Sequence, residues 1–160
     1  KMKYAHIEEN TNKLLGWYDD KIHKNIPSPN IEISEEVWQN AVDNNHNKIN
    51  DDGTTENYDF RTDEEKLLQQ EVELKQAKEK AKANITVTTA NGNTFDGNSE
   101  ARLNMQNSIA ASEITSITET RWKLTDNSIV TVNVTEIKEA LALSIMECGR
   151  IVMATSIEEL

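Results

Sequence analysis

Short alternating stretches and longer amphipathic stretches follow one another twice in the second half of the chain. Apolar and polar residues alternate in ITVTT and TFDG, which flank Asn91-Gly92, the strongest short signal for a hairpin turn. The stretch TRWKLTDNSIVTVNV predicts a second hairpin. Apolar residues recur at helical spacing over 100–116 and 136–153, with Ser99 and Thr135 as expected N-caps. The order ββαββα predicts a four-stranded sheet with its helices on one face.

The segment before this domain predicts a single charged helix. The run DEEKLLQQEVELKQAKEKAKA contains no Gly or Pro and is rich in helix formers, and Thr62 and Glu65 form a capping box in front of it. It opens with three acidic residues and carries four lysines towards its end (Lys75, Lys78, Lys80 and Lys82), which complements the helix dipole. Its apolar face is narrow, so the helix is either a spacer or a weak coiled-coil seam that joins copies into a homo-oligomer.

The first 61 residues predict a small β-rich module. Strands are expected over 3–8 and 14–22, with Gly16 as a bulge, and the two prolines of NIPSP predict an extended connector. Ser34 is the expected N-cap of a short helix over 35–44. A loop follows, with a brief strand near Ile49 and a further short strand or docking point at Tyr58 and Phe60.

The whole chain is therefore expected to be an α+β protein in three parts. The parts are the N-terminal module (1–61), the linking helix (62–83) and the C-terminal domain (84–160). Hydrophobic residues make up 36% of the chain, which predicts a thin core.

Charge narrows the classes of partner. The net charge is −11, spread over both halves of the chain, and phosphate-binding surfaces need clustered Lys and Arg. We therefore expect neither a nucleic-acid partner nor an anionic membrane surface. The stretch KMKYAHIEEN lacks the apolar segment of a secretory signal, and the one cysteine, Cys148, suits a reducing compartment.

The residues that usually carry chemistry form no known pattern. His6, His23 and His46 match no zinc spacing, and Cys148 lies on the predicted apolar stripe of the last helix, where a buried structural thiol is expected. The chain has no nucleophile elbow, no phosphate-binding loop and no dinucleotide fingerprint. We expect a protein that is not an enzyme and has no cofactor or metal.

One segment stands out from this polar chain. Residues 16–39, GWYDDKIHKNIPSPNIEISEEVWQ, hold two of the three tryptophans and both prolines. Two interpretations remain open: a small core in which Trp38 packs against Trp17, or a surface that docks on another protein, since Trp and Tyr dominate interface anchors. The candidate partner-binding residues are Trp17, Tyr18, Ile22, His23, Ile26 and Trp38.

The order of residues in this segment resembles the tail-fibre assembly proteins of tailed bacteriophages. In that family a Gly-aromatic-Tyr-Asp stretch leads to Ile-His, then Ile-Pro, then an acidic and aliphatic run that opens a short helix. The matching positions are Gly16, Tyr18, Asp19, Ile22, His23, Ile26, Pro27, Glu32, Ile33, Ser34, Glu35, Glu36 and Gln39. The second half, with NGNTFDG and RWKLTDNSIVTVNVTEI, resembles a domain of unknown function found at the C-terminus of phage tail proteins. In place of the family's proline-rich linker stands the charged helix.

The resemblance implies an assembly chaperone. Such a protein binds the C-terminal part of a trimeric tail fibre or receptor-binding protein in the bacterial host cytoplasm and aids its folding or trimerisation. A structural tail or fibre-tip component, kept in the phage particle or in a phage-tail-like bacteriocin, is the alternative. An acidic decoy that mimics DNA is a third reading, supported by net charge alone.

Overall fold

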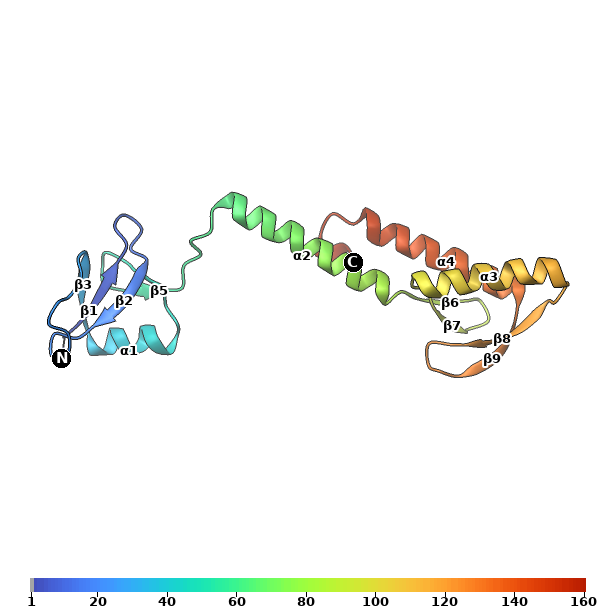
Figure 1. Cartoon of the computed structure of the whole chain (residues 1–160), viewed down its shortest axis with the longest axis horizontal. Coiled ribbons are helices and arrows are strands. Elements are labelled where there is room, and N and C mark those ends of the chain that lie inside the picture. The colour runs from blue at the N-terminus through green and yellow to red at the C-terminus, as the bar shows by residue number, and fades with distance from the viewer. Residues whose placement is uncertain (1) are drawn as a thin grey trace. The chain divides into compact units, whose positions relative to one another are not determined.

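Helices and antiparallel strands make up the computed structural model, which describes residues 2–160, and they confirm the α+β class. The chain divides into two units, residues 1–62 and 63–160 (Figure 1). The predicted linking helix belongs to the second unit, and we describe each unit by itself.

A three-stranded antiparallel sheet organises the N-terminal unit. Its order is β2-β1-β3, with β1 (Met2–Ile7) in the centre, β2 (Leu14–Tyr18) on one side and β3 (Asn30–Ser34) on the other. The sequence predicted an extended connector at NIPSP but not the strand after it, since the segment that follows Pro29 pairs with β1. Proline lacks the N–H that a ladder needs, and here it stands just before the strand.

A short helix follows β3 without a loop. Helix α1 (Glu35–Asp43) begins after Ser34, whose Oγ accepts a hydrogen bond from the Val37 N–H at 3.2 Å, so the predicted N-cap is confirmed. A small hairpin of β4 (Lys48–Ile49) and β5 (Thr55–Glu56) completes the unit. Ile49 is fully buried with Ala5 and Ile7 of β1.

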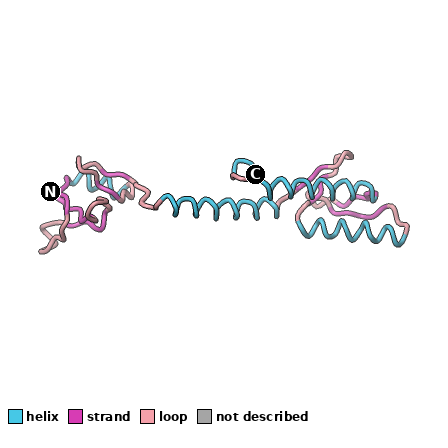
Figure 2. Tube along the Cα trace, turned by 90° about the horizontal axis from the view of Figure 1, so that it is seen from above, coloured by secondary structure: helices cyan, strands magenta, loops and turns pink. Residues whose placement is uncertain are grey.

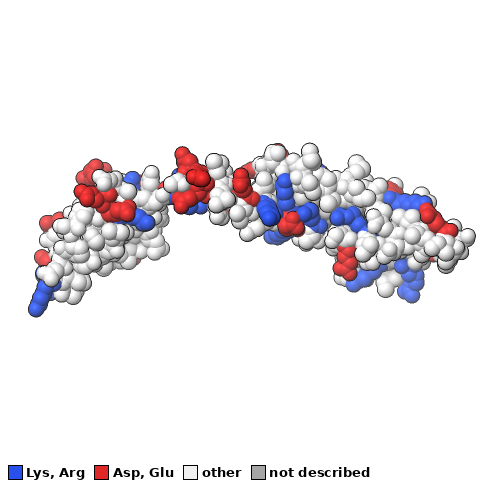
Figure 3. All heavy atoms as spheres, turned by 45° about the horizontal axis from the view of Figure 1, so that its top comes forward, with Lys and Arg blue, Asp and Glu red and all other residues white. Residues whose placement is uncertain are grey.

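The C-terminal unit begins with the long charged helix. Helix α2 (Asp63–Ala83) confirms the prediction for this segment, and Figure 2 shows it as one uninterrupted helix. Acidic side chains gather at its start and basic ones along its later turns (Figure 3). Its second half joins the domain: Ala81 packs against the core, and Lys78 Nζ donates a hydrogen bond to the Val152 carbonyl at 2.8 Å.

Two separate hairpins form instead of the predicted four-stranded sheet. Strands β6 (Thr86–Thr88) and β7 (Thr94–Asp96) pair with each other, as do β8 (Glu119–Lys123) and β9 (Ile129–Asn133). The hairpins touch where Thr125, beyond the end of β8, donates its N–H to the Thr94 carbonyl at 3.1 Å. Over the described residues, no ladder joins β7 to β8.

The two remaining helices are capped one and two residues before the predicted caps. Helix α3 (Ser99–Thr115) is capped by Asn98, and helix α4 (Val134–Met153) is capped by Asn133, so the caps predicted at Ser99 and Thr135 were wrong. A short 3-10 turn, η1 (Ile157–Glu159), ends the chain. The core between helices and hairpins is formed by Ile85, Val87, Phe95, Met105, Leu124, Val132, Ile137, Ala140 and Ile151.

Gly97 lies where the first hairpin meets α4. A Cβ at this position would lie 2.5 Å from Ile85 Cγ2 and 2.7 Å from Ser144 Oγ, closer than real carbon atoms approach. The Gly97 N–H also donates to the Ile85 carbonyl at 2.7 Å, which holds the backbone in this place. The absence of a side chain therefore sets how closely the hairpin packs on the helix.

We expect Gly97→Ala to lower the free energy of unfolding of the C-terminal unit by about 1–3 kcal/mol, since overpacking a rigid core has that cost. Urea denaturation followed by circular dichroism measures the change. Adding Ser144→Ala removes one of the two clashing groups and should restore part of the loss. A Gly97→Ala protein as stable as wild type would contradict the close packing.

A buried carboxylate ties the turn of the first hairpin to the start of α4. Glu136 is only 5% exposed, and its carboxylate accepts hydrogen bonds from Thr89 Oγ1 (2.7 Å), Asn91 Nδ2 (3.0 Å) and Asn93 Nδ2 (2.8 Å). Burial by itself would raise the pKa of Glu136, but the three hydrogen bonds outweigh it and lower that pKa below its usual value.

We therefore expect the free energy of unfolding to fall when acid protonates Glu136. A lowered native pKa adds stability above the unfolded pKa of about 4.3, and this is lost as pH drops through the native pKa. We expect Glu136→Gln to lower the free energy of unfolding at pH 7 by about 1.5–3 kcal/mol, the range for hydrogen bonds to a charged group. Urea midpoints measured from neutral to acid pH should also change less in the variant. An unaltered pH dependence would contradict this account.

Candidate partner interface

The pairing of β1 with β2 sorts the candidate residues onto two faces of the N-terminal sheet. Trp17 stands opposite Ala5 and Tyr18 opposite Tyr4. Because successive side chains of a strand point to opposite faces, Trp17 shares the face of the buried Ala5 and Ile7, and Tyr18 shares the face of Tyr4. The candidates do not form a single surface.

Trp17 and Trp38 belong to the packed face. Trp17 packs against the core cluster of Ala5, Ile7 and Ile49. The ring of Trp38, which comes from α1, lies 4.5 Å from Lys3 Nζ. The same ammonium pairs with Asp19 Oδ2 at 2.9 Å, and both charged side chains are only 14% exposed.

This packed charge pair gives Trp38 a definite role. The hydrogen bond from Lys3 is the largest cause that lowers the pKa of Asp19, and the N–H of Lys21 adds to it. A cation over an indole face is attracted by the ring quadrupole, so Trp38 and Asp19 hold Lys3 between helix and sheet. Both tryptophans thus have contacts inside the unit.

The opposite face carries an aromatic group that we call the aromatic face: Tyr4, His6 and Tyr18. The ring of Tyr18 meets His6 edge-on, with ring centroids 6.2 Å apart, and it meets His23 edge-on at 5.1 Å. Gly16, the residue opposite His6, makes room for this: a Cβ there would lie 3.3 Å from Tyr18 Cε2. The glycine of the Gly-aromatic-Tyr stretch therefore lets the tyrosine ring lie on the sheet.

A tight turn next to this face presents an apolar side chain to solvent. The Asp19 carbonyl accepts hydrogen bonds from the N–H groups of Ile22 (3.0 Å) and His23 (2.8 Å). The Asp19 N–H donates to His23 Nδ1 at 3.1 Å, which closes the turn from the other side. Ile22 lies at the tip of this turn and is 75% exposed.

Ile26 lies at the start of the loop that leads into β3. It is half-buried, and the loop after it is tied to the sheet by the Ile7 N–H, which donates to the Pro29 carbonyl at 3.1 Å. Asn30 Nδ2 also donates to the Pro27 carbonyl at 2.8 Å. The backbone on both sides of the aromatic face is thus held by hydrogen bonds.

The structure brings Tyr18, Ile22 and His23 together and adds two residues that sequence reasoning missed. Tyr4 and His6 join them through strand alternation, a signal that becomes useful only when the register of β1 is known. Glu32 of β3 stands opposite Tyr4, and its charge is the largest cause that raises the pKa of the Tyr4 phenol. The face is therefore aromatic with an acidic border.

Comparisons with known proteins assign no family to this chain. The chain matches no protein-family model, no curated protein and no solved structure. The site must accordingly be judged on its own geometry.

The described part of the chain contains neither a metal-binding cluster nor a membrane-spanning helix. Within residues 2–160, no group of three or more His, Cys, Asp or Glu side chains is placed to hold a metal ion. No helix in that range has the length and apolarity to cross a membrane. His46 Nδ1 lies 2.7 Å from Thr55 Oγ1, and Cys148 is half-buried and packs against the C-terminal core.

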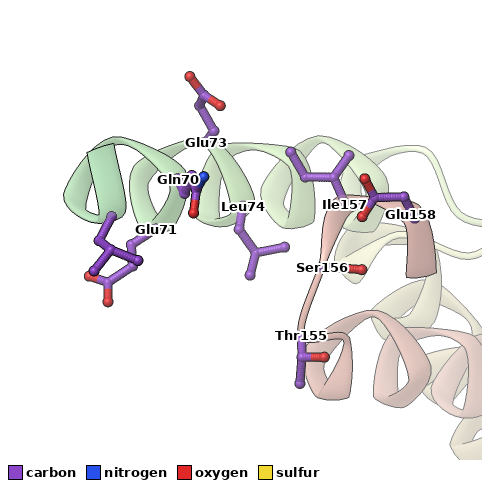
Figure 4. Close-up of a pocket in the computed structure, with 9 residues that line it drawn as sticks. Gln70, Glu71, Glu73, Leu74, Thr155, Ser156, Ile157 and Glu158 are labelled. Carbon is purple, nitrogen blue, oxygen red and sulfur yellow. The ribbon is translucent and has the colours of Figure 1, made fainter. Parts of the chain in front are cut away.

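A shallow groove of about 430 Å³ lies between α2 and the segment 155–158. Leu74 points from α2 toward this segment, whereas Glu73 points away from it (Figure 4). The lining combines leucine side chains with carboxylates such as Glu71 and Glu158 and holds no lysine, arginine or histidine.

We expect Trp17→Ala to destabilise the N-terminal unit rather than to remove an exposed binding contact. Truncating a half-buried aromatic residue that packs on Ala5 and Ile7 is expected to lower the free energy of unfolding of the N-terminal unit by about 2–4 kcal/mol. Hydrogen exchange with mass spectrometry resolves the unit: peptides from β1 and β2 should exchange faster, while peptides from α4 stay unchanged. Unchanged exchange in β1 would show that Trp17 does not support the core.

Proposed function

We propose that the protein is a non-enzymatic assembly chaperone for a phage tail fibre. It binds the C-terminal region of the fibre or receptor-binding protein in the bacterial host cytoplasm and aids its folding or trimerisation. The observation that carries this proposal is the aromatic face with the exposed Ile22 beside it, to which the segment that resembles tail-fibre assembly proteins contributes Tyr18 and Ile22.

The physical need for such a partner follows from the fibre. Intertwined β-rich trimers depend on contacts far apart in sequence, so they fold slowly and expose unpaired strand edges while they do so. A partner that covers these edges until the trimer closes would keep them from aggregating.

The aromatic face has the properties of a reversible binding surface. Tyr and His side chains combine an apolar ring with a hydrogen-bonding group, and here the rings are already held in place by the contacts of Tyr18 with His6 and His23. A surface that is ordered before binding loses less conformational entropy when a partner docks. Ile22 supplies an apolar contact at its border.

Co-expression with the fibre tests the proposal. With wild-type protein, more of the fibre should be recovered as soluble trimer than without it. Ile22→Gln should reduce binding to the C-terminal fibre fragment about tenfold, a loss of about 1.4 kcal/mol. Because Ile22 is 75% exposed, the same change should leave unfolding within about 0.5 kcal/mol of wild type.

Val42→Gln is the matched control, because Val42 is an exposed β-branched residue on α1, away from the aromatic face. It should leave fibre binding unchanged. A fibre that is equally soluble and trimeric without this protein would overturn the chaperone role. Mass spectrometry of purified particles provides a second check, since stoichiometric amounts of the protein there would favour a structural tail component instead.

A further inference from the structure

The second half of α4 exposes an uninterrupted apolar stripe. Six exposed positions between residues 142 and 153 are apolar or glycine and follow one side of the helix, while Ala140, Ser144 and Ile151 on the other side are buried. The exposed fractions of Met146 and Met153 are 71% and 79%. We call this surface the outer stripe of α4; it consists of Ala142, Ile145, Met146, Gly149, Val152 and Met153.

The charged residues of this half-helix lie beside the stripe and satisfy each other. Arg150 Nη2 lies 2.7 Å from Glu147 Oε1, and Arg150 Nε donates to Glu147 Oε2 at 3.0 Å. The outer stripe itself carries no charge. A contiguous exposed apolar surface with polar residues at its edge marks an interaction site on a soluble protein, so the outer stripe has the composition of a covered surface.

Small and large residues alternate along the stripe with a seven-residue period. Ala142 and Gly149 occupy one heptad position, and Ile145 and Val152 occupy the position three residues later. A Cβ added at Gly149 would meet nothing within 4 Å in the single chain. Glycine inside a helix costs about 0.5–1 kcal/mol relative to alanine, and close approach of another backbone is a recognised use for it.

We propose that a second copy of this chain covers the outer stripe by antiparallel packing of α4 on α4. In antiparallel register, Ile145 of each copy lies over Gly149 of the other, and Val152 lies over Ala142. Each of these layers then joins one large and one small side chain, which fills space evenly. Parallel packing would place Gly149 on Gly149 and Ile145 on Ile145, so gaps would alternate with crowded layers.

The self-complementary pattern of the outer stripe favours a second copy as the occupant, and charge limits where two copies can meet. Two chains with a net charge of −11 each repel one another, and they can approach at low cost only where neither presents charge. The outer stripe meets this condition on both copies at once. It is also self-complementary, as an interface with two-fold symmetry requires. Helix α2, for which the sequence left a coiled-coil seam open, has no comparable stripe. Its exposed apolar residues Leu68 and Val72 are followed on the same side by Lys75 and Glu79.

Oligomeric state in solution tests the pairing without any fibre present. Light scattering after gel filtration of the full chain should give twice the chain mass of 18.1 kDa. Ile145→Glu places a charge in each layer around Gly149 and should yield the monomer with an unchanged circular dichroism spectrum. Ile114→Glu on α3 is the matched control, because Ile114 is 84% exposed and lies outside the stripe, and it should remain a dimer.

Cysteine cross-linking tests the antiparallel register. In a Cys148→Ser background, chains with Ile145→Cys and chains with Gly149→Cys should form a disulfide-linked dimer when mixed and oxidised, and much less when either is oxidised alone. Cross-linking of each variant with itself would overturn the antiparallel register. A wild-type chain that stays monomeric across a concentration series would overturn the dimer, whatever its effect on a fibre.

Discussion

The antiparallel register between β1 and β2 is the constraint on which the N-terminal unit depends. Pairing Tyr4 with Tyr18 places Ala5 and Trp17 on the same side, where they form the core with Ile49. A slip of one residue would turn Trp17 to the other face and bring Tyr18 into the core, because side chains alternate along a strand. The bulge between His6 and Ile7 lies where this register ends and the turn begins.

The C-terminal unit depends on a different kind of constraint, the approach of its first hairpin to α4. Gly97 lets the backbone come close to Ser144, and Glu136 holds the turn of the same hairpin through Thr89, Asn91 and Asn93. One contact is purely steric and the other is a buried charge with full hydrogen bonding. Together they dock a hairpin that is too short to extend into a larger sheet.

The parts predicted well from the sequence are those with local signals. Ser34 followed by two glutamates marked the start of α1, and Asn91-Gly92 marked a hairpin turn. Where two good caps stand close together, as Asn98 does next to Ser99, the sequence does not decide between them. The prediction of a four-stranded sheet was wrong. The two hairpins meet through Thr125, which lies in a loop, and a contact of this kind has no sequence signature. Alternation in the predicted strand already separates Trp17 from Tyr18, but the residues of β1 that join each of them were hidden until the strand register was known.

The two proposed surfaces differ in chemistry as a transient interface differs from a permanent one. The aromatic face mixes rings with hydrogen-bonding groups and an acidic border at Glu32, as in interfaces that form and separate. The outer stripe of α4 is uncharged and alternates small with large residues, as in interfaces that stay closed. A chaperone has to release its client but can keep its own oligomeric state throughout. Under the proposed chaperone role, an exposed α4 stripe would compete for the apolar surfaces of an unfinished fibre, so the proposed second copy would leave the aromatic face to define the client.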